Sequence, residues 1–143
     1  MAAVDSLEGE PHALAHGDLH LKNWYITRGG EMGLGDWPCS ARAQQGRDFA
    51  YAIGTALAVD DRRAWERDLL ALYLDRLAES GGPRRAFGDA WDAYRQQLIP
   101  ALTWWTVTLC PTPDIPEMQP KEVSLEFIKR LATAMDDLDS LDN

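Results

Sequence analysis

The sequence predicts an α+β domain that is mainly helical and carries a small β-hairpin near its N-terminal end. Short apolar segments interrupted by glycine precede residue 46, and stretches with apolar residues at helical spacing follow it. With 143 residues, the chain has the size of one domain and can bury a core without disulfides or zinc. We therefore expect a single domain, in which residues 12–45 form a loop and a hairpin and residues 46–143 form a helical region.

The hairpin is expected between residues 24 and 34. Residues 24–27, WYIT, are aromatic and β-branched, and such residues favour strands. Residues 28–30, Arg-Gly-Gly, can form a turn, after which residues 32–34 return as the second strand.

Four helices are expected after residue 46. The first would have Asp48 as its N-cap, because a carboxylate there can accept backbone N–H bonds. The second would start after Asp60 or Asp61 and end at the Gly-Gly-Pro of residues 81–83. The third contains Pro100, which we expect to kink or split it. A proline-rich loop over residues 110–120 precedes the last helix, which ends in an acidic tail from Asp136.

The helical period also predicts which residues of these helices face the core. They are Phe49, Ala52, Ile53, Ala56 and Leu57 in the first helix, Trp65, Leu69, Leu72 and Leu77 in the second, Phe87, Trp91, Tyr94, Leu98, Leu102 and Trp105 in the third, and Phe127, Ile128, Leu131, Met135 and Leu138 in the last.

The charge and cysteine content narrow the range of partners. The chain has 14 basic and 23 acidic residues, a formal net charge of −9, which disfavours nucleic acid and anionic membranes and favours a cationic small molecule. Its two cysteines are too few for a disulfide framework and fit no metal-ligand spacing. Residues 1–11 contain no basic residue, unlike a signal peptide, and no apolar run is long enough to span a bilayer. We expect a cytoplasmic protein with no nucleic acid and no membrane partner.

The most informative residues lie between His16 and Asp36. Residues 16–23 read HGDLHLKN, which has the pattern H-x-D-x-x-x-x-N, and residues 35–37 read GDW. Phosphoryl transfer from a nucleotide needs a carboxylate that accepts the proton of the attacking hydroxyl, together with hard oxygen ligands for magnesium. A hairpin returns the chain to the point where it began, so the spacing predicts that Asp36 lies near Asn23.

The two motifs resemble the C-terminal lobe of the aminoglycoside phosphotransferase and choline kinase-like superfamily, which shares the protein-kinase fold. The resemblance implies that Asp18 is the catalytic base and that His16, in the same catalytic loop, packs beneath the site. It also implies that Asn23 and Asp36 bind the Mg²⁺ that accompanies ATP. The matching motifs cover residues 12–60, and the later helices are similar only in kind, as a substrate-binding region.

Two further positions bear on the resemblance. Asp48, within the sequence GRDFA, resembles the buried aspartate of the family that caps a helix and braces the catalytic loop. Lys22 stands where the family commonly has a small residue, and it could contact a nucleotide phosphate or point into solvent.

No glycine-rich loop and no strand lysine precede His16, so we expect the N-terminal nucleotide lobe to be absent, the chain being a fragment or a natural remnant. The sequence thus predicts the C-terminal catalytic lobe of an ATP-dependent small-molecule O-phosphotransferase, nearly inactive in isolation. Its substrate would be a hydroxylated and, on charge grounds, cationic small molecule.

Alternative functions remain open. A kinase-derived binding or assembly module without transferase activity would also explain the missing lobe. His12, His16 and His20 are spaced by four, which on a helix would align three imidazoles for a metal-dependent hydrolase, although Pro11 and Gly17 argue against a helix there.

Several surface features have both a functional and an ordinary explanation. Trp104 could belong to a box for a quaternary ammonium group, whereas Trp105 falls on the core-facing stripe. Asp114, Glu117 and Glu122 could attract an amine substrate or form a solvated surface. Without the partner lobe, apolar surface around Trp24 and Tyr25 should be exposed, which predicts a homodimer. The alternative is that residues 1–11 fold back as a lid.

Overall fold

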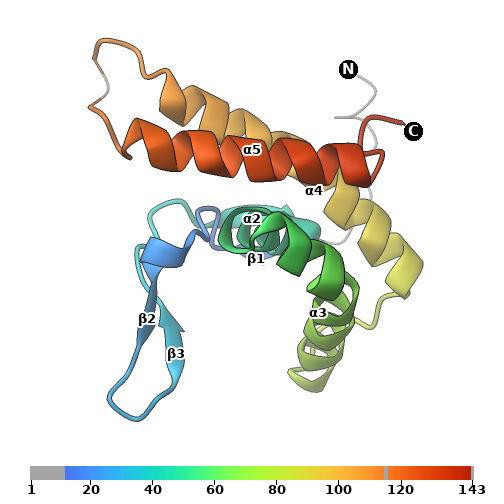
Figure 1. The fold of residues 1–143 in the computed structure, drawn as a ribbon. Coiled ribbons are helices and arrows are strands. Elements are labelled where there is room, and N and C mark those ends of the chain that lie inside the picture. Colours follow the sequence, from blue (N-terminus) through green and yellow to red (C-terminus); the bar gives the residue numbers. More distant parts are fainter. Residues whose placement is uncertain (1–11, 115, 143) are drawn as a thin grey trace.

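The computed structural model describes residues 12–114 and 116–142. Within these residues the fold is α+β and mainly helical, as the sequence predicted, and it consists of four α-helices and two small antiparallel sheets (Figure 1). The expected lid over residues 1–11 lies outside the described residues. No helix in the described part of the chain is long and apolar enough to cross a membrane.

One sheet is the predicted hairpin, formed by β2 (Trp24–Ile26) and β3 (Met32–Leu34). Trp24 pairs with Leu34 and Ile26 with Met32, and the turn uses Gly30 at a φ of 84°, a conformation that glycine adopts without a steric penalty. The hairpin projects away from the helices in Figure 1.

The other sheet was not predicted. It pairs β1 (His12–Ala15) with β4 (Ala41–Gln44), so that Ala15 lies opposite Ala41. This pairing brings the two ends of residues 16–40 together. The loop that follows β1 and the segment that follows the hairpin are therefore held at the same place.

The helices begin earlier than predicted. Helix α2 (Gly46–Ala56) has Gln45 at its N-cap position, so Asp48 lies in the first turn and the prediction that it caps this helix is wrong. Helix α3 (Val59–Glu79) begins before Asp60 and Asp61, whose negative charges lie in the first turn, where the helix dipole favours them. The loop that follows α3 contains Gly81 at a φ of 88°.

Helix α4 (Phe87–Leu109) continues through Pro100 as one helix and bends in its middle, so it is not split (Figure 1). Helix α5 (Lys121–Asp137) runs beside α4, and both lie over α2. These three helices enclose the core, which includes the fully buried Tyr94, Leu98 and Leu131.

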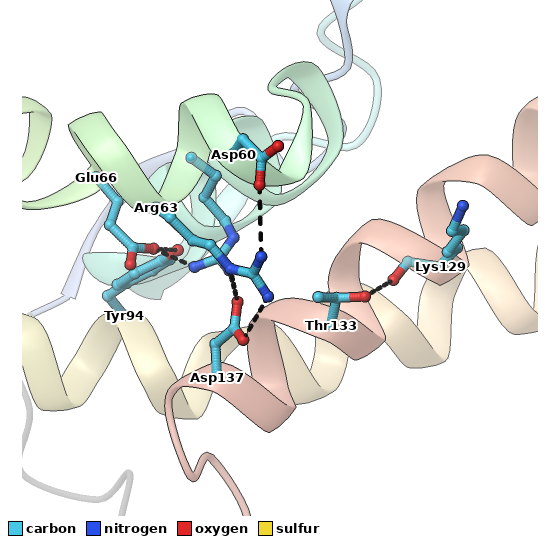
Figure 2. A network of polar contacts seen from close by, with 8 residues as sticks. Asp60, Arg63, Glu66, Tyr94, Lys129, Thr133 and Asp137 are labelled. Carbon is cyan, nitrogen blue, oxygen red and sulfur yellow. Dashed lines mark hydrogen bonds and ion pairs between the residues drawn. The ribbon is translucent and has the colours of Figure 1, made fainter.

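The predicted core stripe of α3 is only partly confirmed, because Leu69 packs against the core and Leu77 is half-buried but the other two residues are not buried. Trp65 and Leu72 are exposed, whereas Arg62, Glu66 and Leu70 are buried. These three residues share one face at a spacing of four, and Arg62 donates to Glu66 across 2.6 Å. This face of α3 is therefore partly ionic. Its polar partners are Tyr94 on α4, which donates to Glu66, and Asp137 on α5, which pairs with Arg62; Figure 2 shows Glu66, Tyr94 and Asp137.

Candidate functional site

Helix α2 holds the loop that follows β1 through the side chain of Asp48. The backbone N–H of His16 donates to Asp48 Oδ2 at 2.6 Å, and that of Gly17 donates to Oδ1 at 3.0 Å. A carboxylate that accepts two backbone N–H groups fixes the path of the loop more firmly than a single bond would. Asp48 therefore makes the bracing contact that the resemblance implied, without capping its helix.

Gly17 allows this loop to pass close to the segment before β4. Its φ is 84°, and a Cβ atom at this position would lie 2.4 Å from the carbonyl oxygen of Cys39. Both the backbone conformation and the close approach require glycine.

His16 connects the loop to the end of the hairpin. Its ring is 2% exposed and packs against Trp37, with the ring centroids 4.6 Å apart. His16 Nε2 donates to the carbonyl of Gly35 at 2.8 Å, and Nδ1 accepts from the Asp18 N–H at 3.3 Å. Since a carbonyl can only accept, the imidazole carries its proton on Nε2.

The hairpin brings Asp36 back to this loop. The Gly35 N–H donates to the carbonyl of Asn23 at 2.8 Å, so the two residues lie opposite each other at the open end of the hairpin. Asp36 follows immediately, at a φ of 59°, with its side chain exposed. The loop of Asn23 and the residue before Asp36 are thus joined as the spacing predicted.

Asp18 is held mainly through one of its two carboxylate oxygens. Oδ1 accepts a 2.7 Å hydrogen bond from the Tyr51 hydroxyl. Oδ2 lies 3.5 Å from His20 Nε2 and 3.5 Å from Asn23 Nδ2. Burial raises the pKa of the Asp18 carboxyl, but hydrogen bonds from His20 and Tyr51 outweigh it and hold the pKa below its ordinary value. Asp18 is therefore ionised at neutral pH.

Asn23 and Asp36 supply hard oxygen atoms suited to Mg²⁺. Asn23 Nδ2 donates to the Asp18 carbonyl at 2.8 Å, which leaves Oδ1 as the atom that can face a cation. Mg²⁺ usually retains several waters and takes one or two protein oxygens in addition to phosphate oxygens. Across residues 12–114 and 116–142, no three histidine, cysteine or acidic side chains gather into a metal cage. The donor set fits a metal that is shared with a nucleotide.

The hypothesis of a three-histidine metal site is wrong in its geometry. His12 lies on strand β1, so the three residues do not follow one helix. Both ring nitrogens of His16 are occupied by Gly35 and Asp18. The His20 ring is buried with its edge toward Trp105, at a centroid distance of 5.9 Å.

Lys22 contacts the proline-rich segment. Its Nζ donates to Gln119 Oε1 at 2.7 Å, and the bond is exposed to solvent. This contact ties the 3-10 turn η1 (Leu21–Asn23) to the chain just before α5. The Lys22 ammonium is therefore engaged by Gln119. Among the described residues, no contact of Lys22 with Asp36 is seen.

The remaining candidate residues fall in two groups. Trp105 is 1% exposed and its ring centroid lies 4.6 Å from that of Phe127, so Trp105 belongs to the core. Trp104, in contrast, is exposed. Asp114, Glu117 and Glu122 are all exposed.

Sequence reasoning missed Tyr51, which contacts Asp18 directly. The signal was present, because Tyr51 follows Asp48 by three residues and residues at this spacing share one face of a helix. A helix that braces the loop through Asp48 must present Tyr51 on nearly the same side.

No protein-family model, curated protein or solved structure matches the chain. Every statement about the activity of this chain accordingly depends on the residues between His16 and Tyr51 and on their geometry.

Proposed function

We propose that the chain forms the C-terminal catalytic lobe, of protein-kinase-like fold, of an ATP-dependent O-phosphotransferase that acts on a hydroxylated small molecule. The observation that carries this proposal is the junction at Gly35. Its carbonyl accepts from His16 and its N–H donates to Asn23, so Asp36 joins the loop that contains Asp18. Asp18 and Asn23 lie on one loop, and Asp36 lies at the hairpin end that is bonded to this loop, which supports a shared site for the proposed proton acceptor and the proposed metal ligands.

Each residue has a distinct role in the proposed reaction. Asp18 accepts the proton of the attacking hydroxyl group, and its low pKa keeps it ionised for this purpose. Asn23 and Asp36 hold Mg²⁺, which neutralises charge on the nucleotide phosphates when it is bound. His16 and Asp48 bind neither substrate nor metal but fix the loop and the hairpin end relative to each other.

The nucleotide needs contacts beyond these. The four described strands contain no lysine, and no glycine-rich loop covers the site within the described residues. In the proposed reaction the ATP phosphates need further positioning groups, which a second lobe would supply. The net charge of −9 favours an acceptor that combines its hydroxyl with a cationic group.

The test is transfer of the γ-phosphate of Mg-ATP to a panel of amino alcohols, aminoglycosides and choline. The chain is assayed alone and within its natural full-length reading frame. We expect transfer in the full-length context, and a loss of at least about 100-fold in kcat for Asp18→Asn, as for removal of a general base. Asp75→Asn, an exposed aspartate on α3, is the matched control and should retain full activity.

Absence of transfer to every acceptor in the full-length context would contradict the proposal. So would full activity of Asp36→Asn at limiting magnesium, because this variant removes the only carboxylate in the proposed ligand set.

A second candidate function is a kinase-derived binding or assembly module. The observation that favours it is the surface of the hairpin, where Tyr25, Ile26 and Met32 are exposed, Ile26 to 73%. An isolated two-stranded hairpin is only marginally stable in water and gains from a partner. The assay above separates the two functions, because a binding module would associate with a partner and transfer no phosphate.

A further inference from the structure

We propose that Tyr51 is a positioning residue for Asp18: its hydroxyl holds Oδ1 in place so that Oδ2 accepts the proton of the attacking hydroxyl. This inference rests on the proposed phosphotransferase function. It assigns a role to a residue that lies outside the motifs of the catalytic loop and of the hairpin end.

The first support is the set of distances around the Asp18 carboxylate. An O–H···O hydrogen bond is normally 2.7–2.8 Å long, and the bond from Tyr51 to Oδ1 is 2.7 Å. The contacts of Oδ2 with His20 and Asn23 are 3.5 Å each, which is long for a hydrogen bond. Among the described residues, Tyr51 therefore makes the one short hydrogen bond to this carboxylate.

The second support is that packing holds the Tyr51 side chain in place. It is buried on α2, and its ring packs beside the core residue Trp105, with centroids 5.9 Å apart. Asp48, one helical turn earlier, holds the backbone of the same loop at His16 and Gly17. One face of α2 thus fixes the loop backbone and the reactive carboxylate together.

The surroundings keep the Tyr51 hydroxyl a donor. Burial raises the pKa of Tyr51 well above its ordinary value, and the Asp18 carboxylate raises it further. Of the other titratable groups nearby, the Cys39 thiol raises this pKa and the Arg47 guanidinium lowers it, while His20 faces Asp18 from the opposite side. Tyr51 does not act as a base itself.

The contact specifies which oxygen reacts. In the proposed step the O–H bond of the acceptor breaks, its proton moves to Asp18 Oδ2, and the oxygen forms a bond to the γ-phosphorus. The bond between that phosphorus and the oxygen of the leaving ADP breaks at the same time. Because Tyr51 engages Oδ1, the plane of the carboxylate is fixed and Oδ2 faces one direction, so a larger share of encounters is productive.

The test compares Tyr51→Phe with Tyr94→Phe in the full-length protein. The two substitutions are chemically identical, because the Tyr94 hydroxyl also donates to a buried carboxylate, Glu66 Oε2, at 2.8 Å. We expect Tyr51→Phe to lower kcat about tenfold or more with an unchanged KM, as for loss of a hydrogen bond to a charged group. Tyr94→Phe should keep kcat while losing a similar amount of thermal stability.

High-resolution structures of the wild type and of both variants give a readout that needs no activity. Asp18 should keep one carboxylate orientation in the wild type and in Tyr94→Phe, and adopt more than one in Tyr51→Phe. An active wild type with an unchanged kcat or an unchanged Asp18 orientation in Tyr51→Phe would overturn the role of Tyr51 alone. An inactive wild type would overturn the proposed function and the catalytic role of Tyr51 with it.

Discussion

Two clusters in this protein each join a tyrosine hydroxyl, a carboxylate and a basic side chain, and they differ in the basic residue. In one, Tyr51 donates to Asp18 and the neighbouring basic side chain is His20. In the other, Tyr94 donates to Glu66 (Figure 2). The cation of this cluster is Arg62, whose Nη1 lies 2.6 Å from Glu66 Oε2.

The difference matches the division that we propose between a reactive site at Asp18 and a structural cluster at Glu66. Arg62 is permanently charged and also pairs with Asp137, so the cluster ties α3 to α4 and α5 and leaves only 7% of the Glu66 side chain exposed. His20 lies 3.5 Å from Asp18 Oδ2, and the Asp18 side chain remains 22% exposed. A carboxylate that accepts a proton from a substrate has to be accessible to it, and of these two carboxylates Asp18 is the more exposed.

The largest effect on stability is expected from Arg62→Ala. The substitution leaves Glu66 buried without its cation, and breaking such a pair typically costs about 3–5 kcal/mol. Urea denaturation measures the free energy of unfolding. Arg76→Ala, which removes an exposed arginine paired with Glu79, is the control and should cost less than about 1 kcal/mol. Equal losses in the two variants would show that the Arg62 cluster is not structural.

A smaller loss is expected from Asp48→Ala, which acts on the Asp18 side of the comparison. Two backbone N–H groups lose a charged acceptor, and we expect a cost of about 2–4 kcal/mol. Hydrogen exchange should accelerate at the amides of His16 and Gly17, whereas the amides of α5 stay protected. Unchanged exchange at these two amides would mean that Asp48 does not brace the loop.

The acid limb of stability should depend on Asp137. Hydrogen bonds from Arg63 hold the pKa of Asp137 below its ordinary value, with further support from the charges of Arg62 and Arg63. A carboxyl whose pKa is lower in the folded state stabilises the fold above its ordinary pKa, and this contribution is lost as pH falls through the folded-state pKa. Asp137→Asn should remove this contribution to the pH dependence of the free energy of unfolding and should cost about 1 kcal/mol of stability at neutral pH. An acid limb identical to that of the wild type would contradict this.

The smallest effect on folding is expected at the hairpin. Ile26→Asp places a charge at an exposed position and should change stability by less than about 0.5 kcal/mol. If the exposed hairpin mediates the predicted homodimer, this variant should be a monomer at micromolar concentrations while the wild type associates. Light scattering distinguishes them, and a monomeric wild type would refute the dimer.

The elements with local signals could be predicted from the sequence. The β2–β3 hairpin followed from residues 24–27 and a glycine turn, and the helices followed from apolar residues at helical spacing. The β1–β4 pair could not be predicted, since residues 12–15 and 41–44 are short, poor in β-branched residues and far apart in the sequence.

The polar clusters were harder to predict, because their partners are distant in the sequence. Arg62 and Glu66 become buried because Tyr94 and Asp137, which are distant in the sequence, contact them. Tyr51 meets Asp18 only because Asp48 and Gly17 set the path of the loop. The residues of the loop over positions 16–23 and the bracing Asp48 were recognisable in the sequence, whereas the contact of Tyr51 with Asp18 was not.

The most direct test neutralises the carboxylate in each cluster and measures phosphate transfer from Mg-ATP by the full-length protein. We predict that Asp18→Asn abolishes transfer with little loss of stability, whereas Glu66→Gln lowers stability and retains kcat. Transfer by Asp18→Asn at the wild-type rate would contradict the claim that the Asp18 cluster is the reactive one.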